Sequence, residues 1–273
     1  MVALFFTSNS ISGQTMATPS DTATTWQLLK YDANRTVKGI THAVTRPLHW
    51  KGKDFEKLGG IVLGSVMLSA LDQPSSDFFR RQEKDVPMVI REFGFYFGQP
   101  QNYLMANAGI YGFGLLTKNE KIRRTSVLIL SSAATAGYIQ IFARTAFGRA
   151  RPLGEDGPFT FKPFKGGDKY YSFPSGHMVL GMTMAHSIAK QFDNIWLKIG
   201  IYSVGSIPGF SRLLSGKHWL TDVAVGTALA IVVVDSVDKF LFGTNSYNVS
   251  KKEKKVSWNF RIGGSQLGVV GTF

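Results

Sequence analysis

Apolar and polar stretches alternate along the chain and divide it into segments of helical length. Six stretches rich in Gly, Ala, Leu, Ile, Val and Met lie at residues 58–71, 103–117, 125–143, 178–192, 195–210 and 219–242. Their length and composition predict α-helices. Only 125–143 is a charge-free run near the length of about 20 residues that a bilayer span needs. The pattern predicts an all-α bundle of about six apolar helices, which we expect to be membrane-embedded. A soluble bundle with unusually apolar helices is the alternative.

The two ends of the chain differ from this central part. Residues 1–16 contain a short apolar stretch followed by small and polar residues, as in a truncated secretion signal. Residues 17–57 are polar, and a short amphipathic helix is expected around Trp26. Val256–Phe273 alternates apolar and polar positions, which predicts a short β segment. We therefore expect three parts: a signal-like and amphipathic region at 1–57, a functional domain at 58–242 and a basic tail at 243–273.

Composition narrows the possible partners. The 273 residues are 44% hydrophobic and 18% charged, which excludes an intrinsically disordered protein. Cysteine is absent, so disulfides, cysteine-ligated metals and cysteine nucleophiles are excluded. The net charge of +13 favours anionic partners. The positive surplus is concentrated at 30–57, 118–124, 144–169 and 243–255. Because these patches form no continuous basic–aromatic stripe, nucleic acid is not expected as a partner.

Three polar clusters stand at the ends of the predicted helices. They read R-TAFGRA-RP at 144–152, PSGH at 174–177 and SR-LLSGK-H-WLT-D at 211–222. The first follows one apolar segment, the second precedes another, and the third joins the last two. If neighbouring helices are antiparallel, all three clusters meet on one face of the bundle. We therefore expect them to form a single site.

The residue types in these clusters match the chemistry of a phosphoryl group. Three arginines, Arg144, Arg151 and Arg212, carry planar guanidinium groups that are permanently charged and can donate paired hydrogen bonds to phosphate oxygens. Ser175 and Gly176 add a hydroxyl and backbone N–H groups at a helix N-terminus, where the helix dipole favours anions. The ligand predicted from these residues is a phosphorylated molecule.

Two histidines in the clusters supply a nucleophile and a proton donor. Asp222 follows His218 by four residues, so on a helix its carboxylate would orient the imidazole and stabilise positive charge there. His177 is the second histidine. The sequence shows no cluster of metal-binding carboxylates, so we expect metal-free phosphoryl transfer without a cofactor. Arg149 lies inside the first cluster, where it could contact a headgroup or be solvated.

The motifs R-x6-RP, PSGH and SR-x5-H-x3-D, in this order, resemble the three signature motifs of the type 2 phosphatidic acid phosphatase (PAP2) superfamily. That superfamily includes lipid phosphate phosphatases, bacterial non-specific acid phosphatases and vanadium-dependent haloperoxidases. The motifs span 144–222, and the matching helical pattern extends over about 58–242. Arg144 stands where the first motif usually has lysine, so a planar guanidinium replaces a compact ammonium group.

The resemblance implies a role for each matching residue. His218 would attack phosphorus and form a phosphohistidine, oriented by Asp222. His177 would protonate the leaving oxygen and then activate water. The phosphate oxygens would be held by five residues, Arg144, Arg151, Ser175, Gly176 and Arg212.

Several functions are compatible with these features. The leading expectation is a metal-independent phosphatase that hydrolyses a lipid phosphate or pyrophosphate monoester at a membrane through a phosphohistidine. A soluble periplasmic acid phosphatase of broad specificity is the main alternative. A vanadate-dependent haloperoxidase is disfavoured because such enzymes are generally longer. A non-enzymatic transporter or scaffold would leave both histidines unexplained.

Charge also bears on location. The basic segments 118–124 and 251–255 are typical of cytoplasmic segments, and with six spans they place the catalytic face outside the cytoplasm. We therefore expect a protein of the bacterial cell envelope whose active site faces the periplasm or the exterior. A cleaved secretion signal would instead place the N-terminus outside and invert the six-span arrangement. The sequence makes no prediction of the oligomeric state.

Overall fold

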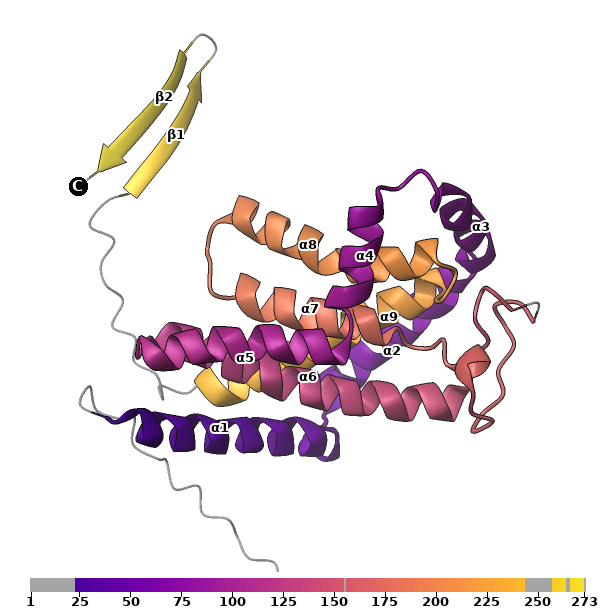
Figure 1. Cartoon of the computed structure of the whole chain (residues 1–273), viewed down its shortest axis with the longest axis horizontal. Helices are drawn as coiled ribbons and strands as arrows, with labels where there is room; N and C mark the ends of the chain where they lie inside the picture. Colours follow the sequence, from indigo (N-terminus) through magenta and orange to yellow (C-terminus); the bar gives the residue numbers. More distant parts are fainter. Residues whose placement is uncertain (1–22, 155, 244–256, 264–265, 273) are drawn as a thin grey trace, which may run out of the picture. The chain divides into compact units, whose positions relative to one another are not determined.

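A computed structural model describes residues 23–154, 156–243, 257–263 and 266–272. Within these residues the chain forms nine α-helices, two short 3-10 helices and two β-strands (Figure 1). The α-helices are α1 Thr25–Thr45, α2 Gly52–Ser69, α3 Asp72–Gln82, α4 Met88–Phe97, α5 Pro100–Leu116, α6 Glu120–Phe147, α7 Gly176–Ala189, α8 Ile195–Leu214 and α9 Leu220–Phe242. The 3-10 helices are η1 Arg46–His49 and η2 Asp168–Tyr170. The all-α prediction is confirmed.

All six predicted helices are present, with shifted ends, as α2 and α5 to α9. The largest difference is in α6, which has 28 residues. It starts early because the Asn119 side chain accepts a hydrogen bond from the Ile122 N–H at 3.1 Å, which caps the first turn. The amphipathic helix expected around Trp26 is α1, which the Thr24 side chain caps. Residues 1–22, where the signal-like segment was predicted, lie outside the described residues.

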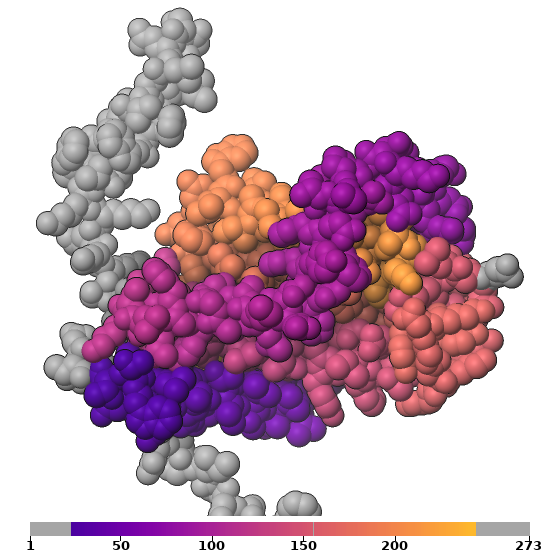
Figure 2. All heavy atoms as spheres, in the orientation of Figure 1, coloured from indigo at the N-terminus to yellow at the C-terminus, as the bar shows by residue number. Residues whose placement is uncertain are grey.

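Two helices between α2 and α5 were not predicted. Most of the residues in α3 are polar, and α4 combines aromatic residues with Gly94. Short helices of this kind depend on tertiary packing more than on intrinsic propensity. Here α3 packs against α8 and α9, and α4 packs chiefly against α8. Figure 2 shows these two helices as the purple atoms at the upper right of that view.

Helix α7 is the centre of the bundle. It packs against α6, α8 and α9, and nine of its 14 residues are buried. A helix that is apolar on all sides requires such a central position. The largest core cluster joins α1, α6, α7 and α9 through Ala43, Leu128, Val179, Val234, Val237 and Leu241, among others. This core fixes the ends of α6, α7 and α9, from which the motif residues project.

The predicted C-terminal β segment is confirmed and consists of two strands. β1 (Ser257–Gly263) pairs antiparallel with β2 (Gln266–Thr272). The register runs from Ser257 opposite Thr272 to Gly263 opposite Gln266. The basic residues 251–255 lie outside the described residues.

Several helices expose large apolar side chains. On α2 these include Leu63, Val66 and Met67, the last with 78% of its surface accessible. Further examples lie on α5, α6 and α8, among them Leu116, Phe142 and Trp196. By length and composition, α6 and α9 qualify as candidate membrane spans within the part of the chain that the structure describes.

Close packing of α7 on α8 depends on Gly205, and this contact generates a stability prediction. A Cβ at Gly205 would lie 2.3 Å from the Cβ of Ala185, whereas a Cβ at Gly200, on the same helix, would meet nothing within 4 Å. We expect Gly205→Ala to destabilise the fold by about 1–3 kcal/mol through overpacking. Gly200→Ala should be neutral or slightly stabilising, since alanine favours the helix. Thermal unfolding of both purified variants checks this, and equal midpoints would contradict it.

Candidate active site

The three motif clusters lie together at one end of the bundle. The backbone N–H of Ser175 donates to the carbonyl of Asp222 at 3.1 Å, which joins the second cluster to the third. Arg149 joins the first cluster to the third through an ion pair of 2.7 Å with Asp222. The structure therefore gathers the histidines, the arginines and the Ser-Gly pair in one place.

His218 lies in the loop before α9, two residues ahead of Leu220, and not on the helix as the four-residue spacing suggested. Only 5% of its surface is accessible. Its Nδ1 lies 2.6 Å from the carbonyl oxygen of Ser172 and 3.7 Å from Oδ2 of Asp222. Because a carbonyl can only accept, Nδ1 carries the proton and Nε2 holds the lone pair. Ser172 therefore fixes the tautomer, and Asp222 acts on the ring through its charge.

Asp222 is fully buried and held by three donors. Its Oδ1 accepts from Nη1 of Arg149 at 2.7 Å. Its Oδ2 accepts from the backbone N–H of Trp219 at 2.8 Å and from the Ser172 hydroxyl. The Trp219 bond satisfies an N–H group at the start of α9, where the helix dipole favours negative charge.

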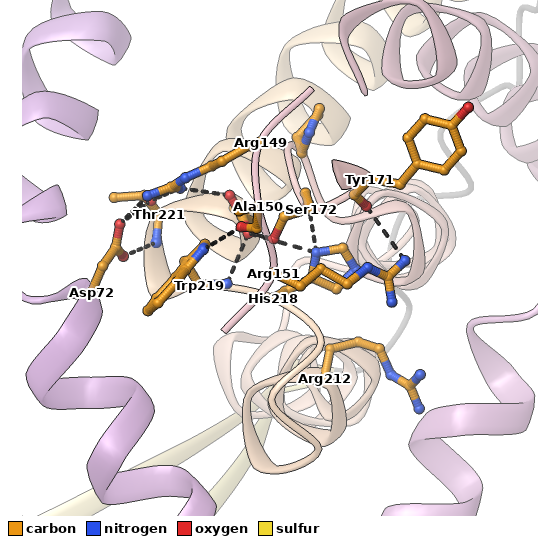
Figure 3. A network of polar contacts seen from close by, with 12 residues as sticks. Asp72, Arg149, Ala150, Arg151, Tyr171, Ser172, Arg212, His218, Trp219 and Thr221 are labelled. Carbon is orange, nitrogen blue, oxygen red and sulfur yellow. Dashed lines mark hydrogen bonds and ion pairs between the residues drawn. The ribbon is translucent and has the colours of Figure 1, made fainter. Parts of the chain in front are cut away.

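Arg149 is neither solvated nor free to contact a headgroup, so both sequence-based alternatives for it were wrong. Its accessible surface is 3%, and its guanidinium bridges two carboxylates, Asp222 and Asp72, with Nη2 at 2.6 Å from Oδ2 of Asp72. The carbonyl of Pro158 accepts from Nε and Nη2 at 3.0 and 2.8 Å. Figure 3 shows this network running from Asp72 through Arg149 toward His218.

The left-handed turn that ends α6 places Arg149. Gly148 has φ +56°, and a Cβ there would lie 1.9 Å from the carbonyl oxygen of Lys162. Only glycine allows both this conformation and this approach. The Lys162 N–H donates to the Gly148 carbonyl at 2.8 Å, which ties the returning loop to the helix end. The first motif therefore turns inward directly after α6.

The three predicted phosphate-binding arginines lie at the ends of α6 and α8 and in the loop after α6. Arg144 lies in the last turn of α6 with its guanidinium 4.7 Å from the centre of the Tyr171 ring. Arg151 lies in the following loop and pairs with Asp168 at 2.9 Å. Arg212 lies in the last turn of α8, 4.9 Å from the Phe95 ring. In Figure 3 the guanidinium ends of Arg151 and Arg212 lie on the side of His218 away from Asp72.

Buried polar atoms of this region indicate the kind of ligand it suits. Five of them have no hydrogen-bond partner among the residues that the structure describes: Nε of Arg144, Nε of Arg151, Nε of Arg212, Oγ of Ser175 and Nε2 of His177. Buried polar groups are nearly always paired, so such a set points to a ligand rich in acceptor oxygens. A phosphate group has this chemistry. Within the same described residues, no group of three or more His, Cys, Asp or Glu side chains could hold a metal ion.

Helix α4 covers His177, which lies in the first turn of α7. The rings of Phe95 and His177 are 6.1 Å apart, and a Cβ at Gly98 would come within 2.4 Å of the imidazole. Phe95 also lies under Arg212, so one aromatic ring contacts both an acid–base candidate and a phosphate-binding candidate. The segment between α2 and α5 is therefore part of the site.

Burial and positive charge keep both histidines neutral near pH 7. Burial, followed by the charges of Arg212 and His218, lowers the pKa of His177 from 6.5 to about 3. Burial also lowers the pKa of His218, while Asp222 and the Ser172 carbonyl act in the opposite direction. A neutral His218 is the form that can act as a nucleophile.

Sequence reasoning missed Asp72, Ser172 and Phe95. Asp72 belongs to no recognisable motif. In the sequence it is a single acidic residue at the start of a polar segment. Ser172 contacts His218 through its backbone carbonyl, a group that every residue has and that no sequence pattern marks. The position of Arg149 inside the first motif indicated that it lies near the site. Its partner Asp72 in α3 could not be predicted from the sequence.

Comparison with known proteins agrees with the motifs. A model of the PAP2 superfamily matches residues 125–239. The chain is 27% identical over 132 residues to a lipid A 1-phosphatase of Porphyromonas gingivalis, covering 48% of this chain and 27% of that protein. It is 25% identical to a lipid A 1-phosphatase of Rhizobium etli, covering 67% of this chain and 81% of that protein. The chain therefore spans about a quarter of the Porphyromonas protein and most of the Rhizobium protein.

Two further likenesses are more limited. A stretch of 90 residues is 34% identical to an acid phosphatase of Zymomonas mobilis, covering 32% of this chain and 33% of that protein. The crystal structure of Aquifex aeolicus LpxE superposes with a TM-score of 0.45 at 20% identity, covering 60% of this chain and 93% of that chain. The family match at 125–239 contains the motifs at 144–152, 174–177 and 211–222 in order, with Arg144 in place of the usual lysine. By this match and these residues, the segment 125–239 belongs to the PAP2 superfamily.

Proposed function

We propose that this protein is a metal-independent phosphatase that removes the phosphate of a lipid phosphate or pyrophosphate monoester through a phosphohistidine. The observation that carries the proposal is the environment of His218. A carbonyl fixes its Nδ1 proton, and the guanidinium groups of Arg151 and Arg212 lie on the other side of the ring. A nucleophilic nitrogen beside a site for phosphate oxygens is what in-line phosphoryl transfer requires.

In the first step Nε2 of His218 attacks phosphorus while the bond from phosphorus to the leaving oxygen breaks. The imidazole becomes positively charged, and Asp222 at 3.7 Å stabilises that charge. The arginines hold the non-bridging oxygens, where charge must be stabilised during transfer. The proton that the leaving oxygen needs comes from His177, whose Nε2 is its unpaired atom.

The low pKa of His177 is consistent with this role once substrate is considered. Part of the depression comes from Arg212 and Arg151. A bound phosphate dianion offsets those positive charges and favours the protonated imidazole. His177 is then charged when the substrate is present, which is when an acid is needed. In the second step the neutral His177 takes a proton from water, whose oxygen attacks phosphorus and releases His218.

Three observations favour a lipid over a water-soluble substrate. Large apolar side chains are exposed on α2, α5, α6 and α8, and exposed apolar patches of this kind mark contact with membranes or partners. Two helices, α6 and α9, are candidate membrane spans. Two relatives are named lipid A 1-phosphatase. A membrane-associated phosphatase with a phosphorylated glycolipid substrate accounts for all three.

The proposed location is the bacterial cell envelope, with the site facing the periplasm or exterior. The basic segment 118–124 supports this, because it joins α5 to α6 while the motif clusters gather where α6 ends and α7 begins. Every proposed site residue lies within 58–242, the segment proposed as the phosphatase domain. A soluble acid phosphatase is the second candidate, favoured by the Zymomonas relative.

The proposed substrate class is tested by phosphate release from two substrates at equal phosphate concentration, in excess chelator. One is a phosphorylated glycolipid of the lipid A type in detergent micelles, and the other is a short-chain sugar phosphate. We expect faster release from the lipid, because large apolar side chains are exposed on α2, α5, α6 and α8. We expect no loss in chelator, because in the proposed mechanism arginines hold the phosphate. Preference for the sugar phosphate would favour the acid phosphatase. Activity lost in chelator and restored by a divalent cation would contradict the metal-independent mechanism.

The nucleophile is tested by His218→Ala. We expect turnover to fall by at least about 1,000-fold, because no other nitrogen can replace Nε2. Rapid quench of enzyme mixed with radiolabelled substrate in alkaline detergent, in which a phosphohistidine survives, should trap phosphate on wild-type protein and not on this variant. His49→Ala removes an exposed histidine of η1 and serves as the matched control. Phosphate trapped on the His218→Ala variant would show that another residue is the nucleophile.

The proton donor is tested by His177→Ala with two leaving groups. General acid catalysis contributes about 10²–10⁴-fold where the leaving group is a poor one, such as an alkoxide. A nitrophenyl phosphate needs that proton much less. We therefore expect the phosphorylation rate, measured as a pre-steady-state burst, to fall far more on the alkyl phosphate than on the aryl phosphate. His218→Ala should abolish both bursts, and equal losses in His177→Ala would refute the assignment.

A further inference from the structure

The network beneath His218 contains a carboxylate that the proposed mechanism does not use. Asp72, the first residue of α3, has no accessible surface and belongs to none of the three motifs. Each of its oxygens accepts hydrogen bonds. Oδ1 accepts from the Thr221 N–H at 2.9 Å, and Oδ2 accepts from Arg149 at 2.6 Å and from the Thr221 hydroxyl at 2.7 Å. Because all three partners are donors, Asp72 is ionised.

Asp72 and Asp222 compete for the same guanidinium. Arg149 places Nη2 on Asp72 and Nη1 on Asp222, at 2.6 and 2.7 Å. All three side chains are buried, so solvent screens their charges little. Two carboxylates against one guanidinium leave one net negative charge in this cluster. That charge lies behind the Nδ1 side of His218, where positive charge develops as Nε2 attacks.

The same contacts hold the start of α9. Asp72 accepts from the N–H of Thr221, and Asp222 accepts from the N–H of Trp219, so two carboxylates satisfy donors of one helix terminus. Asp222 lies in this first turn. A shift of the terminus would therefore move Asp222 relative to His218.

We propose that Asp72 is a positioning residue for His218, acting through Arg149 and Asp222. By sharing Arg149, it keeps part of the negative charge of Asp222 available to the imidazole, and it anchors the turn that carries Asp222. Without the Asp72 charge, Arg149 pairs with Asp222 alone and neutralises it. This inference rests on the proposed function only in assigning the transfer step to His218.

The groups that face His218 are few enough to interpret a titration. The charged or titratable groups are Asp222 from α9, Arg151 from the loop after α6, Arg212 from α8 and His177 from α7. The Ser172 carbonyl contacts Nδ1. None of these groups is itself substituted in Asp72→Asn. A change in the pKa of His218 therefore reports the charge of the Asp72–Arg149–Asp222 cluster.

The first experiment compares Asp72→Asn with Asp77→Asn in the full chain. Asparagine is nearly isosteric with aspartate, and Asp77 is an exposed residue of the same helix. For Asp72→Asn we expect kcat to fall about 10–100-fold, as for other groups that orient a functional histidine, with KM within about twofold. The pKa of His218, followed by NMR titration of the imidazole, should fall. Asp77→Asn should match wild type in all three quantities.

A double variant separates electrostatics from simple structural support. Asp72→Asn combined with Arg149→Met again leaves one net negative charge, now on Asp222 alone. We expect the pKa of His218 to return toward the wild-type value, above that of Asp72→Asn. A purely structural role for Asp72 predicts no such return, because the double variant loses more contacts. An unchanged pKa of His218 in Asp72→Asn, or no recovery in the double variant, overturns the proposal.

A third variant keeps the question decidable if Asp72→Asn does not fold. Thr221→Val retains all three charges and removes the hydroxyl that donates to Asp72 and accepts from Arg149. We expect kcat to fall about 2–10-fold at unchanged KM, because the variant loses these two hydrogen bonds and keeps every charge. An unchanged kcat overturns the proposal. If wild-type protein releases no phosphate from any substrate, the proposed function fails, whereas the pKa of His218 across the variants still decides the role of Asp72.

Discussion

The buried guanidinium of Arg149 is the constraint on which the site depends. A charge removed from water requires compensation by partners of opposite charge and by hydrogen bonds. Here the compensation comes from parts of the chain far apart in sequence: Asp72 opens α3, Asp222 lies in the first turn of α9, and Pro158 lies in the loop after α6. Satisfying this one side chain therefore joins three segments. For this reason α3, one of the two helices that the sequence pattern did not predict, becomes part of the site.

Charge of opposite sign lies on the two sides of His218. The cluster of two carboxylates and one guanidinium lies behind Nδ1, and the guanidinium groups of Arg151 and Arg212 lie on the other side (Figure 3). This arrangement suits a ring that gains positive charge while it bonds to an anion. Burial lowers the pKa of His177, and the charges of Arg212 and Arg151 lower it further. In the proposed mechanism a bound phosphate offsets these two charges, so substrate binding favours the protonated imidazole that donates to the leaving oxygen.

Much of this architecture was predictable, and the exceptions share a physical cause. The length and composition of the apolar segments predicted the helices α2 and α5 to α9, because apolar composition is a local property of the sequence. The positions of the three clusters at the ends of antiparallel helices predicted that Arg212, His177 and His218 gather at one end. The pattern did not predict α3 and α4, since their helical structure depends on contacts with α8 and α9. The pattern also did not predict the ion pairs of Arg149, because their partners are distant in the sequence. It did not predict the contact of the Ser172 carbonyl with His218, because every residue has a backbone carbonyl.

The arginine at position 144, where related motifs usually have lysine, has an aromatic partner in the structure. Its guanidinium lies 4.7 Å from the centre of the Tyr171 ring. A planar guanidinium stacks on an aromatic face while its edge still donates to oxygens, whereas an ammonium acts as a point charge. Tyr171 is adjacent to Ser172, whose carbonyl holds Nδ1 of His218. The aromatic partner of Arg144 and the backbone acceptor of His218 therefore lie on consecutive residues. Through this loop the proposed phosphate-binding side of the site and the orientation of His218 depend on the same short segment.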